Sequence, residues 1–189
     1  MYSGNGVLDA LQYAVTQNLA PVISISYGSC EGVNPPDEMR FLAYVAQQAN
    51  AQGITIVASA GDSGATDCDG SISPANYPAK LGLGVDFPSS LPYVTGVGGT
   101  EFNEGNGTYW QPAPVTDVIS SALSYIPEIV WNDSFSLNVL DATGGGASSI
   151  FGKPTWQTGT GVPADGARDV PDISLAASNA HDPYLVCSW

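Results

Sequence analysis

Two short apolar runs, each stopped by a glycine, constrain the fold of this chain more than any other feature of its sequence. The first run covers residues 22–27 and stops at Gly28, and the second covers residues 54–60 and stops at Gly61. Both are rich in β-branched residues, and their length is typical of buried strands. We therefore predict two strands that end in glycine turns.

A helical pattern precedes each of these runs. Apolar residues recur at helical spacing over residues 7–19, which end near Pro21, and over residues 37–52, which end at Gly53. The order helix, strand, helix, strand is typical of a parallel α/β sheet. In such sheets the functional loops gather at the carboxyl ends of the strands.

The second half of the chain has weaker periodicity. Residues 93–100 predict a short strand that runs into a Gly-rich turn, and residues 101–145 predict a hairpin or an irregular excursion. Residues 144–146 are expected to open a loop, and residues 170–177 form a last apolar segment. No internal repeat, long linker or low-complexity tract is present.

The chain is strongly acidic and has the length of one domain. Its 189 residues include 18 Asp and Glu against 4 Lys and Arg, so the formal net charge is −14 at pH 7. Such a chain repels phosphate groups, which argues against nucleic-acid and membrane partners. No apolar run approaches the roughly 20 residues that span a bilayer, and residues 1–5 do not have a signal-peptide pattern. An acidic surface with few lysines fits a secreted protein that works at low pH.

The most informative motif, Ser59-Ala60-Gly61-Asp62-Ser63-Gly64, lies at the end of the second run. A carboxylate among glycines at a strand end is open to a ligand, so Asp62 could serve as an acid, a base or a metal ligand. The alternative is an Asx turn that leads the chain out of the strand.

Asp62, Asp67 and Asp69, followed by Gly70, form an overlapping acidic pattern. Oxygen ligands in a flexible turn suit calcium, but the spacing differs from that of an EF-hand and no Glu closes the loop. A solvated acidic turn is the preferred interpretation. One histidine, His181 in a polar turn, and three scattered cysteines also argue against zinc and against a Ser-His-Asp triad.

The end of the first run, residues 24–28, consists of small residues around Tyr27. Its backbone could pair with an extended peptide, as in strand addition. The alternative is an ordinary core strand.

Taken in order, several segments resemble the sedolisin family of serine-carboxyl peptidases. Each segment is modest alone, and their shared order over most of the chain makes the resemblance specific. It implies a subtilisin-like α/β fold, a parallel sheet flanked by helices and incomplete at both ends, so that residues 1–189 form a partial peptidase domain. The matching segments are residues 22–28, 59–64, 74–79, 93–100, 144–148, 151–157 and 168–174.

The resemblance also implies a chemistry. The family hydrolyses peptide bonds in acid with a Ser nucleophile, a Glu base and an Asp that orients the Glu, while a further Asp lines the oxyanion hole. The match gives that last role to Asp62, which could donate a hydrogen bond to the developing oxyanion when protonated. The residues expected to border the polypeptide substrate are Ser26, Tyr27, Gly28, Ser59 and Gly61.

The sequence departs from the family pattern at both ends. The triad Glu and Asp would lie before Met1, and no Gly-Thr-Ser nucleophile motif occurs before Trp189. Glu31, Asp37 and Glu38 follow the first strand and are not expected to replace them. We therefore expect the isolated chain to be inactive and to bind no cofactor. The calcium ligands of the complete domain would lie beyond Trp189, and the full-length protein could carry a propeptide.

The three cysteines are Cys30, Cys68 and Cys187. Cys30 and Cys68 each follow a strand end on the side where functional loops gather, so they could reach the Cα separation of roughly 5–6 Å that a disulfide needs. Cys187 would then have its partner past Trp189. By count alone, three reduced buried thiols are as good an interpretation. A disulfide would imply an oxidising, extracellular setting.

Two functions remain open from the sequence. The first is a fragment of an acid-active endopeptidase, and the second is a non-catalytic module that holds extended peptides by strand pairing. Calcium binding by the acidic turn is a weaker third.

Overall fold

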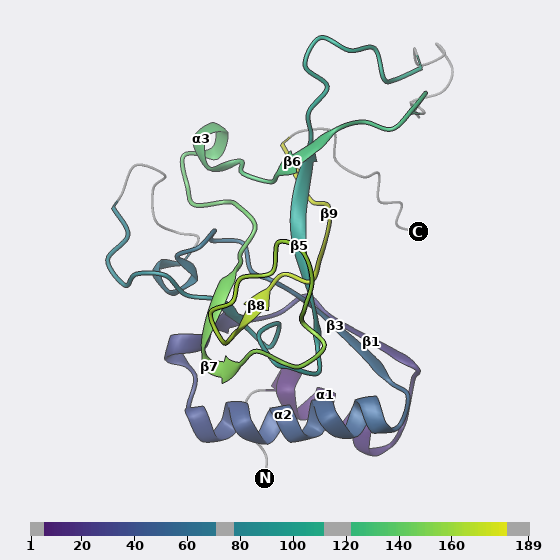
Figure 1. Ribbon diagram of the computed structural model, residues 1–189, viewed down its shortest axis with the longest axis vertical. Helices are drawn as coiled ribbons and strands as arrows, with labels where there is room; N and C mark the ends of the chain where they lie inside the picture. Colours follow the sequence, from purple (N-terminus) through teal and green to yellow (C-terminus); the bar gives the residue numbers. More distant parts are fainter. Residues whose placement is uncertain (1–5, 71–77, 112–121, 181–189) are drawn as a thin grey trace.

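The computed structural model describes residues 6–70, 78–111 and 122–180 (Figure 1). The helices are α1 (Gly6–Thr16), α2 (Pro36–Ala51) and α3 (Ser134–Leu137), with 3-10 turns η1 (Glu31–Val33) and η2 (Asp67–Asp69). The strands are β1 (Val22–Ile25), β2 (Ser29–Cys30), β3 (Thr55–Ser59), β4 (Asp86–Phe87), β5 (Thr95–Phe102), β6 (Glu128–Val130), β7 (Gly146–Gly152), β8 (Ala167–Val170) and β9 (Ile173–Ala176).

The main sheet is parallel through β1, β3, β5 and β9. β3 pairs with β1 on one side and with β5 on the other, and β9 pairs with β5. The parallel α/β sheet predicted from the sequence is therefore confirmed, with one addition: β6 runs antiparallel to β5 and makes the sheet mixed.

β3 and β6 pair with the same edge of β5, and the pairing with β6 begins after the pairing with β3 has ended. The carbonyl of Val97 accepts the amide of Ala60, just past β3. The next carbonyl on that edge, Gly99, accepts the amide of Trp131, just past β6. The segment around Trp131 is thereby brought to the carboxyl end of β3.

The core lies between the sheet and the two long helices. The inward residues of β3 are Ile56 and Ala58, which are 1% exposed, while Thr55, Val57 and Ser59 point to the other face and are less buried. This alternation puts one face of the sheet on α1 and α2 (Figure 1). The buried cluster comprises Leu8, Leu11, Val15, Ile25, Met39, Leu42, Val45, Ala46, Ala49, Ile54, Ile56, Ala58, Phe87, Leu91 and Val94.

The predicted helix over residues 7–19 ends earlier than expected, at Thr16. Asn18 adopts a left-handed conformation with φ of 50°, which turns the chain toward β1 before Pro21. α2 begins at Pro36, where the fixed φ of proline suits the first helical position. None of the helices in the described residues is long and apolar enough to cross a membrane.

The Gly-rich turn predicted within residues 93–100 is wrong, because Gly96 to Gly99 lie inside β5. A β-carbon on Gly98 would lie 2.6 Å from Pro171 Cγ, and one on Gly99 would lie 2.7 Å from Trp131 Cε3. Glycine is required there because neighbouring segments pack directly on the strand backbone.

The last apolar segment, residues 170–177, divides into β8 and β9 around the cis Val170–Pro171 bond. β8 pairs with β7, so residues 144–146 lead into a strand rather than only a loop. Arg168 of β8 has no exposed surface, and its guanidinium donates to both carboxylate oxygens of Asp172 at 2.6 and 2.5 Å. Asp172 in turn accepts the amide of Gly96, which fixes β9 against β5.

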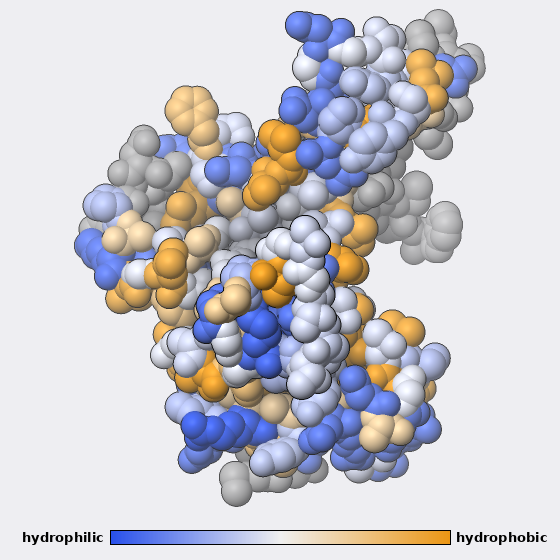
Figure 2. All heavy atoms as spheres, in the orientation of Figure 1, coloured by the Kyte–Doolittle hydropathy of each residue, from blue (hydrophilic) through white to orange (hydrophobic). Residues whose placement is uncertain are grey.

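The described residues between β5 and β6, 103–111 and 122–127, project from the body of the molecule as two arms, in agreement with the hairpin that was the first of the two structures expected there (Figure 1). A bridge joins Trp110 to Ala122 in its described part. Figure 2 shows orange apolar side chains around its base and around α3, where Ile129, Val130 and Phe135 are exposed.

Candidate functional site

The site is built around Asp62 at the carboxyl end of β3. Its side chain is exposed and borders a pocket of about 340 Å³ at the mouth of the parallel sheet. Ser26, Ser59 and Gly61 border the same pocket, so four of the residues predicted from the sequence lie together. The floor is the backbone of β5 at Gly98 and Gly99.

Tyr27 and Gly28 lie next to this pocket but do not line it. Tyr27 is 43% exposed, and Gly28 packs against Asp86 instead. The structure thus brings the predicted residues to one end of the sheet and separates them into two groups. A larger pocket of about 480 Å³ lies at the amino-terminal ends of β3 and β5 and does not include Asp62.

The backbone of Asp62 is held by the segment that follows α3. Its carbonyl accepts the amide of Ala142 at 2.9 Å, and the carbonyl of Gly61 accepts the amide of Gly144 at 2.8 Å. Gly61 itself has φ of 98°, a conformation that glycine adopts without strain. The turn that carries the carboxyl group is therefore fixed by two hydrogen bonds from one segment.

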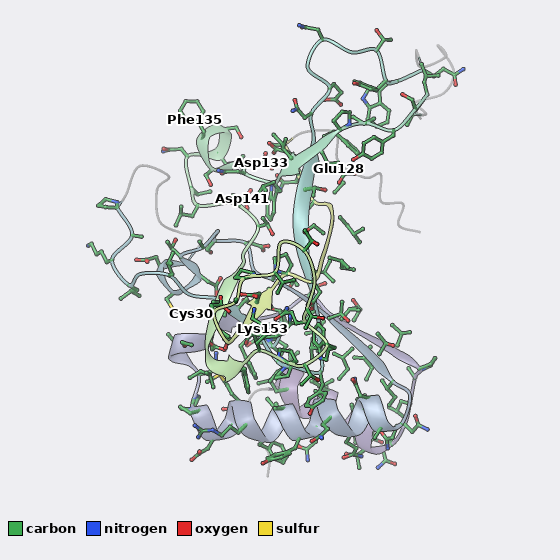
Figure 3. All side chains as sticks on the ribbon, in the orientation of Figure 1. Cys30, Glu128, Asp133, Phe135, Asp141 and Lys153 are labelled. Atoms are coloured by element: carbon green, nitrogen blue, oxygen red, sulfur yellow. A yellow bond between two sulfur atoms is a disulfide. The ribbon has the colours of Figure 1, made fainter. Side chains whose placement is uncertain are left out.

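Trp131 forms a second wall of the pocket. Its indole Nε1 donates to Asp133 Oδ2 at 2.7 Å, and Ser178, past the end of β9, donates to the same oxygen at 2.8 Å. The amide of Asp133 donates to the carbonyl of Asp141, and Figure 3 shows both residues between β6 and α3. Asp133 is 5% exposed, so this network is shielded from water and fixes the indole.

Several carboxyl groups surround Asp62, and their charges repel one another. Burial, then the charge of Asp62, raises the pKa of Asp67 to about 6. Burial, then the charges of Asp67 and Asp62, raises the pKa of Asp86 to about 8. Burial and the charges of Asp133 and Asp62 likewise raise the pKa of Asp141. Burial and mutual repulsion therefore favour the neutral forms of these three carboxyl groups.

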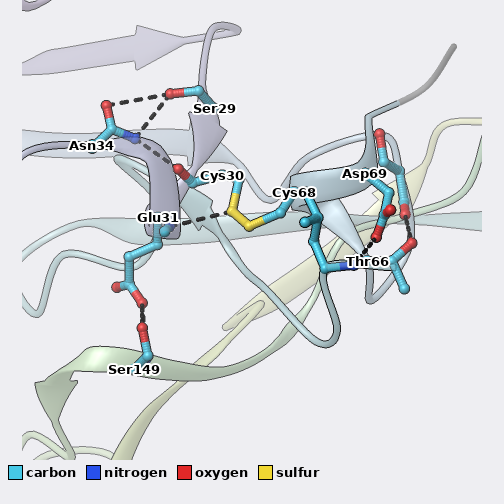
Figure 4. Close-up of a disulfide and its surroundings, with 11 residues drawn as sticks. Ser29, Cys30, Glu31, Asn34, Thr66, Cys68, Asp69 and Ser149 are labelled. Carbon is cyan, nitrogen blue, oxygen red and sulfur yellow. Dashed lines mark hydrogen bonds between the residues drawn. A yellow bond between two sulfur atoms is a disulfide. The ribbon is translucent and has the colours of Figure 1, made fainter. Parts of the chain in front are cut away.

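A disulfide joins Cys30 to Cys68 with a Cα separation of 4.8 Å (Figure 4). It ties the residues after β1 to the loop that follows Asp62. Next to it, the carboxylate of Glu31 accepts the hydroxyl of Ser148 at 2.5 Å and the amide of Ser149 at 2.8 Å. Glu31 is 2% exposed and links η1 to β7, which is a structural role.

The acidic turn differs from the solvated turn predicted from the sequence. Asp69 accepts the amides of Lys80 and Leu81, and Asp67 lies against Gly61. Among the described residues, no group of three or more acidic, His or Cys side chains is placed to hold a metal ion. His181, Cys187 and most of the block 74–79 lie outside the described residues.

A family comparison agrees with this arrangement. Residues 3–174 match the subtilase family. The chain belongs to this family. Within it, the resemblance to sedolisins is confirmed by the relatives, and the subtilisin-like sheet by a solved structure.

The subtilase chain is 37% identical over 180 residues to sedolisin from Pseudomonas sp. (strain 101), a match that covers 93% of this chain and 27% of that protein. It is 33% identical over 184 residues to kumamolisin from Bacillus sp. (strain MN-32), covering 93% and 28%. Pseudomonas sedolisin, a serine-carboxyl proteinase solved with two molecules of pseudo-iodotyrostatin, superposes with a TM-score of 0.70 at 34% identity, covering 94% and 44%. The chain thus spans about a quarter of the length of these curated relatives.

Three residues of this subtilase site were missed by sequence reasoning: Trp131, Asp86 and Asp141. Asp86 had a visible signal, because a carboxylate between Val85 and Phe87 in an apolar stretch predicts a buried acid. Trp131 and Asp141 had no such signal, since their positions depend on how the excursion folds back onto the end of β3.

Proposed function

We propose that this chain supplies the oxyanion carboxyl group and the substrate-binding edge of a serine-carboxyl peptidase that acts in acid. The observation that carries the proposal is the position of Asp62, exposed at the mouth of the parallel sheet and bordering the pocket with Ser26 and Ser59. A protonated carboxyl there donates a hydrogen bond to a carbonyl oxygen that becomes negative during peptide hydrolysis.

The remaining catalytic groups follow from the family. A Ser would attack the scissile carbonyl while a Glu, oriented by an Asp, takes its proton. The sequence offers no match for these three groups, so the proposed activity belongs to a complete domain, with the isolated chain inactive. A propeptide, an extracellular setting and a calcium site in the complete domain are further parts of this proposal.

The test uses two polypeptides. The isolated chain is assayed for casein hydrolysis near pH 4, where no cleavage is expected. A chimera in which residues 6–180 replace the matching part of Pseudomonas sedolisin is expected to cleave casein at that pH. Asp62→Asn in the chimera is expected to lower kcat about 10²–10³-fold, the usual loss for one oxyanion donor.

A matched variant controls for the loss of one carboxyl group. Asp37→Asn in the chimera removes an exposed carboxylate from α2 and is expected to leave kcat unchanged. An active chimera whose turnover does not respond to Asp62→Asn would refute the oxyanion role.

A second function is favoured by the position of β1. Among the described strands its only partner is β3, and Ser24 within it and Ser26 just past it are exposed. An extended peptide could therefore add to this edge without being cleaved. Binding of peptides by the stable isolated chain, together with an inactive chimera, would favour the non-catalytic function.

A further inference from the structure

Asp86 is a buried carboxyl group for which the proposed chemistry has no use. It is 4% exposed, and its Oδ1 has no hydrogen-bond partner among the described residues. A buried carboxylate without a donor is costly, whereas the neutral acid loses much less solvation. The surroundings of Asp86 therefore favour its protonated form.

This carboxyl group lies between the two glycines that follow β1 and β3. A β-carbon on Gly28 would lie 1.9 Å from Asp86 Oδ1. One on Gly61 would lie 3.1 Å from Asp86 Cβ and 3.4 Å from its Oδ2. One side chain thus fills the space that separates the two turns, and neither turn can move inward while it is there.

The backbone of Asp86 is fixed by hydrogen bonds, whereas its side-chain Oδ1 has no such partner among the described residues. In β4 it pairs with Cys30 of β2, its carbonyl accepts the amide of Ser90 at 3.1 Å, and Ser89 Oγ donates to the same carbonyl at 2.8 Å. A change at the carboxyl group is therefore transmitted to the turns at Gly28 and Gly61 rather than to β4.

The charged groups that face Asp86 are acidic. Asp62 and Asp67 come from the loop after β3. A β-carbon on Gly61 would lie 2.9 Å from Asp67 Oδ1, so this carboxyl group and that of Asp86 both border Gly61. Cys30 of β2 forms the disulfide, and the next residue is Glu31. The carboxylate of Glu31 accepts hydrogen bonds from Ser148 and Ser149 of β7. Tyr27 is the titratable neighbour on the Gly28 turn.

We propose that uncharged Asp86 is the spacer that sets the separation of the Gly28 and Gly61 turns, and that loss of its proton opens the base of the candidate cleft. The part concerning the cleft rests on the proposed function, because those turns carry Tyr27 and Asp62. Ionisation would place a second unpaired negative charge beside Asp67, and water must enter to solvate it. The turns then separate, while the disulfide keeps both loops attached.

The experiment measures hydrogen exchange of the full chain between pH 5 and 9, corrected for intrinsic exchange. Protection of the amides in residues 26–31 and 60–64 is expected to fall about tenfold or more over this range, since each pKa unit is a tenfold change in the equilibrium. Asp86→Asn keeps the shape without the charge and is expected to abolish most of that fall. Asp37→Asn, the matched exposed control, is expected to behave as the unaltered chain.

Two outcomes of the exchange experiment would overturn the proposal. One is an unchanged pH dependence in Asp86→Asn, and the other is its loss in Asp67→Asn but not in Asp86→Asn, which would identify Asp67 as the titrating group. If Asp86→Asn fails to fold, the ¹³C shift of the Asp86 carboxyl carbon decides. It must report a protonated acid at pH 6, and a fully ionised group there would contradict the spacer.

Peptide binding separates this proposal from the proposed function. An apolar extended peptide is titrated into the protein at pH 5 and at pH 8. The affinity of the unaltered chain for this peptide is expected to be several-fold weaker at pH 8, and the affinity of Asp86→Asn is expected to be the same at both pH values. A pH-dependent change in hydrogen exchange without any peptide binding would support the spacer role of Asp86 and contradict the proposed function. Binding that is equal at both pH values would contradict the spacer alone.

Discussion

The carbonyl oxygen of Ala60 lies directly against the Cα of Gly144, so that a β-carbon on residue 144 would be 1.9 Å from that oxygen. The contact places the segment after α3 on the strand end that leads into Asp62. The adjacent bond from the amide of Gly144 to the carbonyl of Gly61 depends on the same approach.

Gly144→Ala should therefore destabilise the fold and displace the Asp62 turn. Overpacking of a tight contact costs about 1–3 kcal/mol, and a clash with backbone lies at the upper end. Urea denaturation at pH 5 measures the change in the free energy of unfolding. Gly6→Ala, at a helical site with open space around it, is the control and should be neutral or slightly stabilising.

Loss of the Cys30–Cys68 disulfide should cost about 2–5 kcal/mol of the free energy of unfolding. The bond closes a loop with a sequence separation of 38, which contains all of α2 and β3. Reduction of the unaltered chain should lower the urea midpoint to that of the double variant Cys30→Ser, Cys68→Ser. A reductant that still shifts the double variant would contradict this assignment.

Arg168→Met should be among the most damaging single changes in the described residues. Removing the guanidinium leaves Asp172 without its ion pair in a largely buried position, which costs about 3–5 kcal/mol. Arg40→Met removes a cation from the exposed pair with Asp37 and should change the free energy of unfolding by less than about 1 kcal/mol. Equal effects of the two changes in urea denaturation would show that the Arg168 pair is not structurally important.

The free energy of unfolding should fall as the pH rises from 4 to 8. Asp67 and Asp86 bind protons more tightly in the folded chain, with pKa values of about 6 and 8, than in the unfolded chain, where Asp titrates near 3.9. Their stabilisation is complete below about pH 4 and is lost as the pH passes through the folded values. Urea midpoints at pH 4, 6 and 8 measure this, and a midpoint that rises over the series would contradict it.

Much of the parallel sheet could be predicted from local patterns. β1, β3 and α2 differ from the predicted ranges by one or two residues at most ends, because alternation and helical spacing are properties of adjacent residues. The place of Asp62 at a strand end was predictable for the same reason.

Features made by distant residues could not be predicted. β2 and β4 have two residues each, too few for any periodicity. The glycines of β5 resembled a turn, and only the packing of Trp131 and Pro171 on them shows why a strand needs them. The position of Asp86 between the Gly28 and Gly61 turns likewise depends on how β4 packs, which no local pattern in the sequence reveals.

The pairing of β9 with β5 has a consequence for biosynthesis. The bond from Gly96 to Asp172 spans 76 residues, so the partner of that edge leaves the ribosome long after β1, β3 and β5. In the meantime the nascent chain presents an open edge rich in glycine, which has no side chains to block foreign strands. We therefore expect cellular yield to depend on chaperones that shield this edge until β9 has been translated.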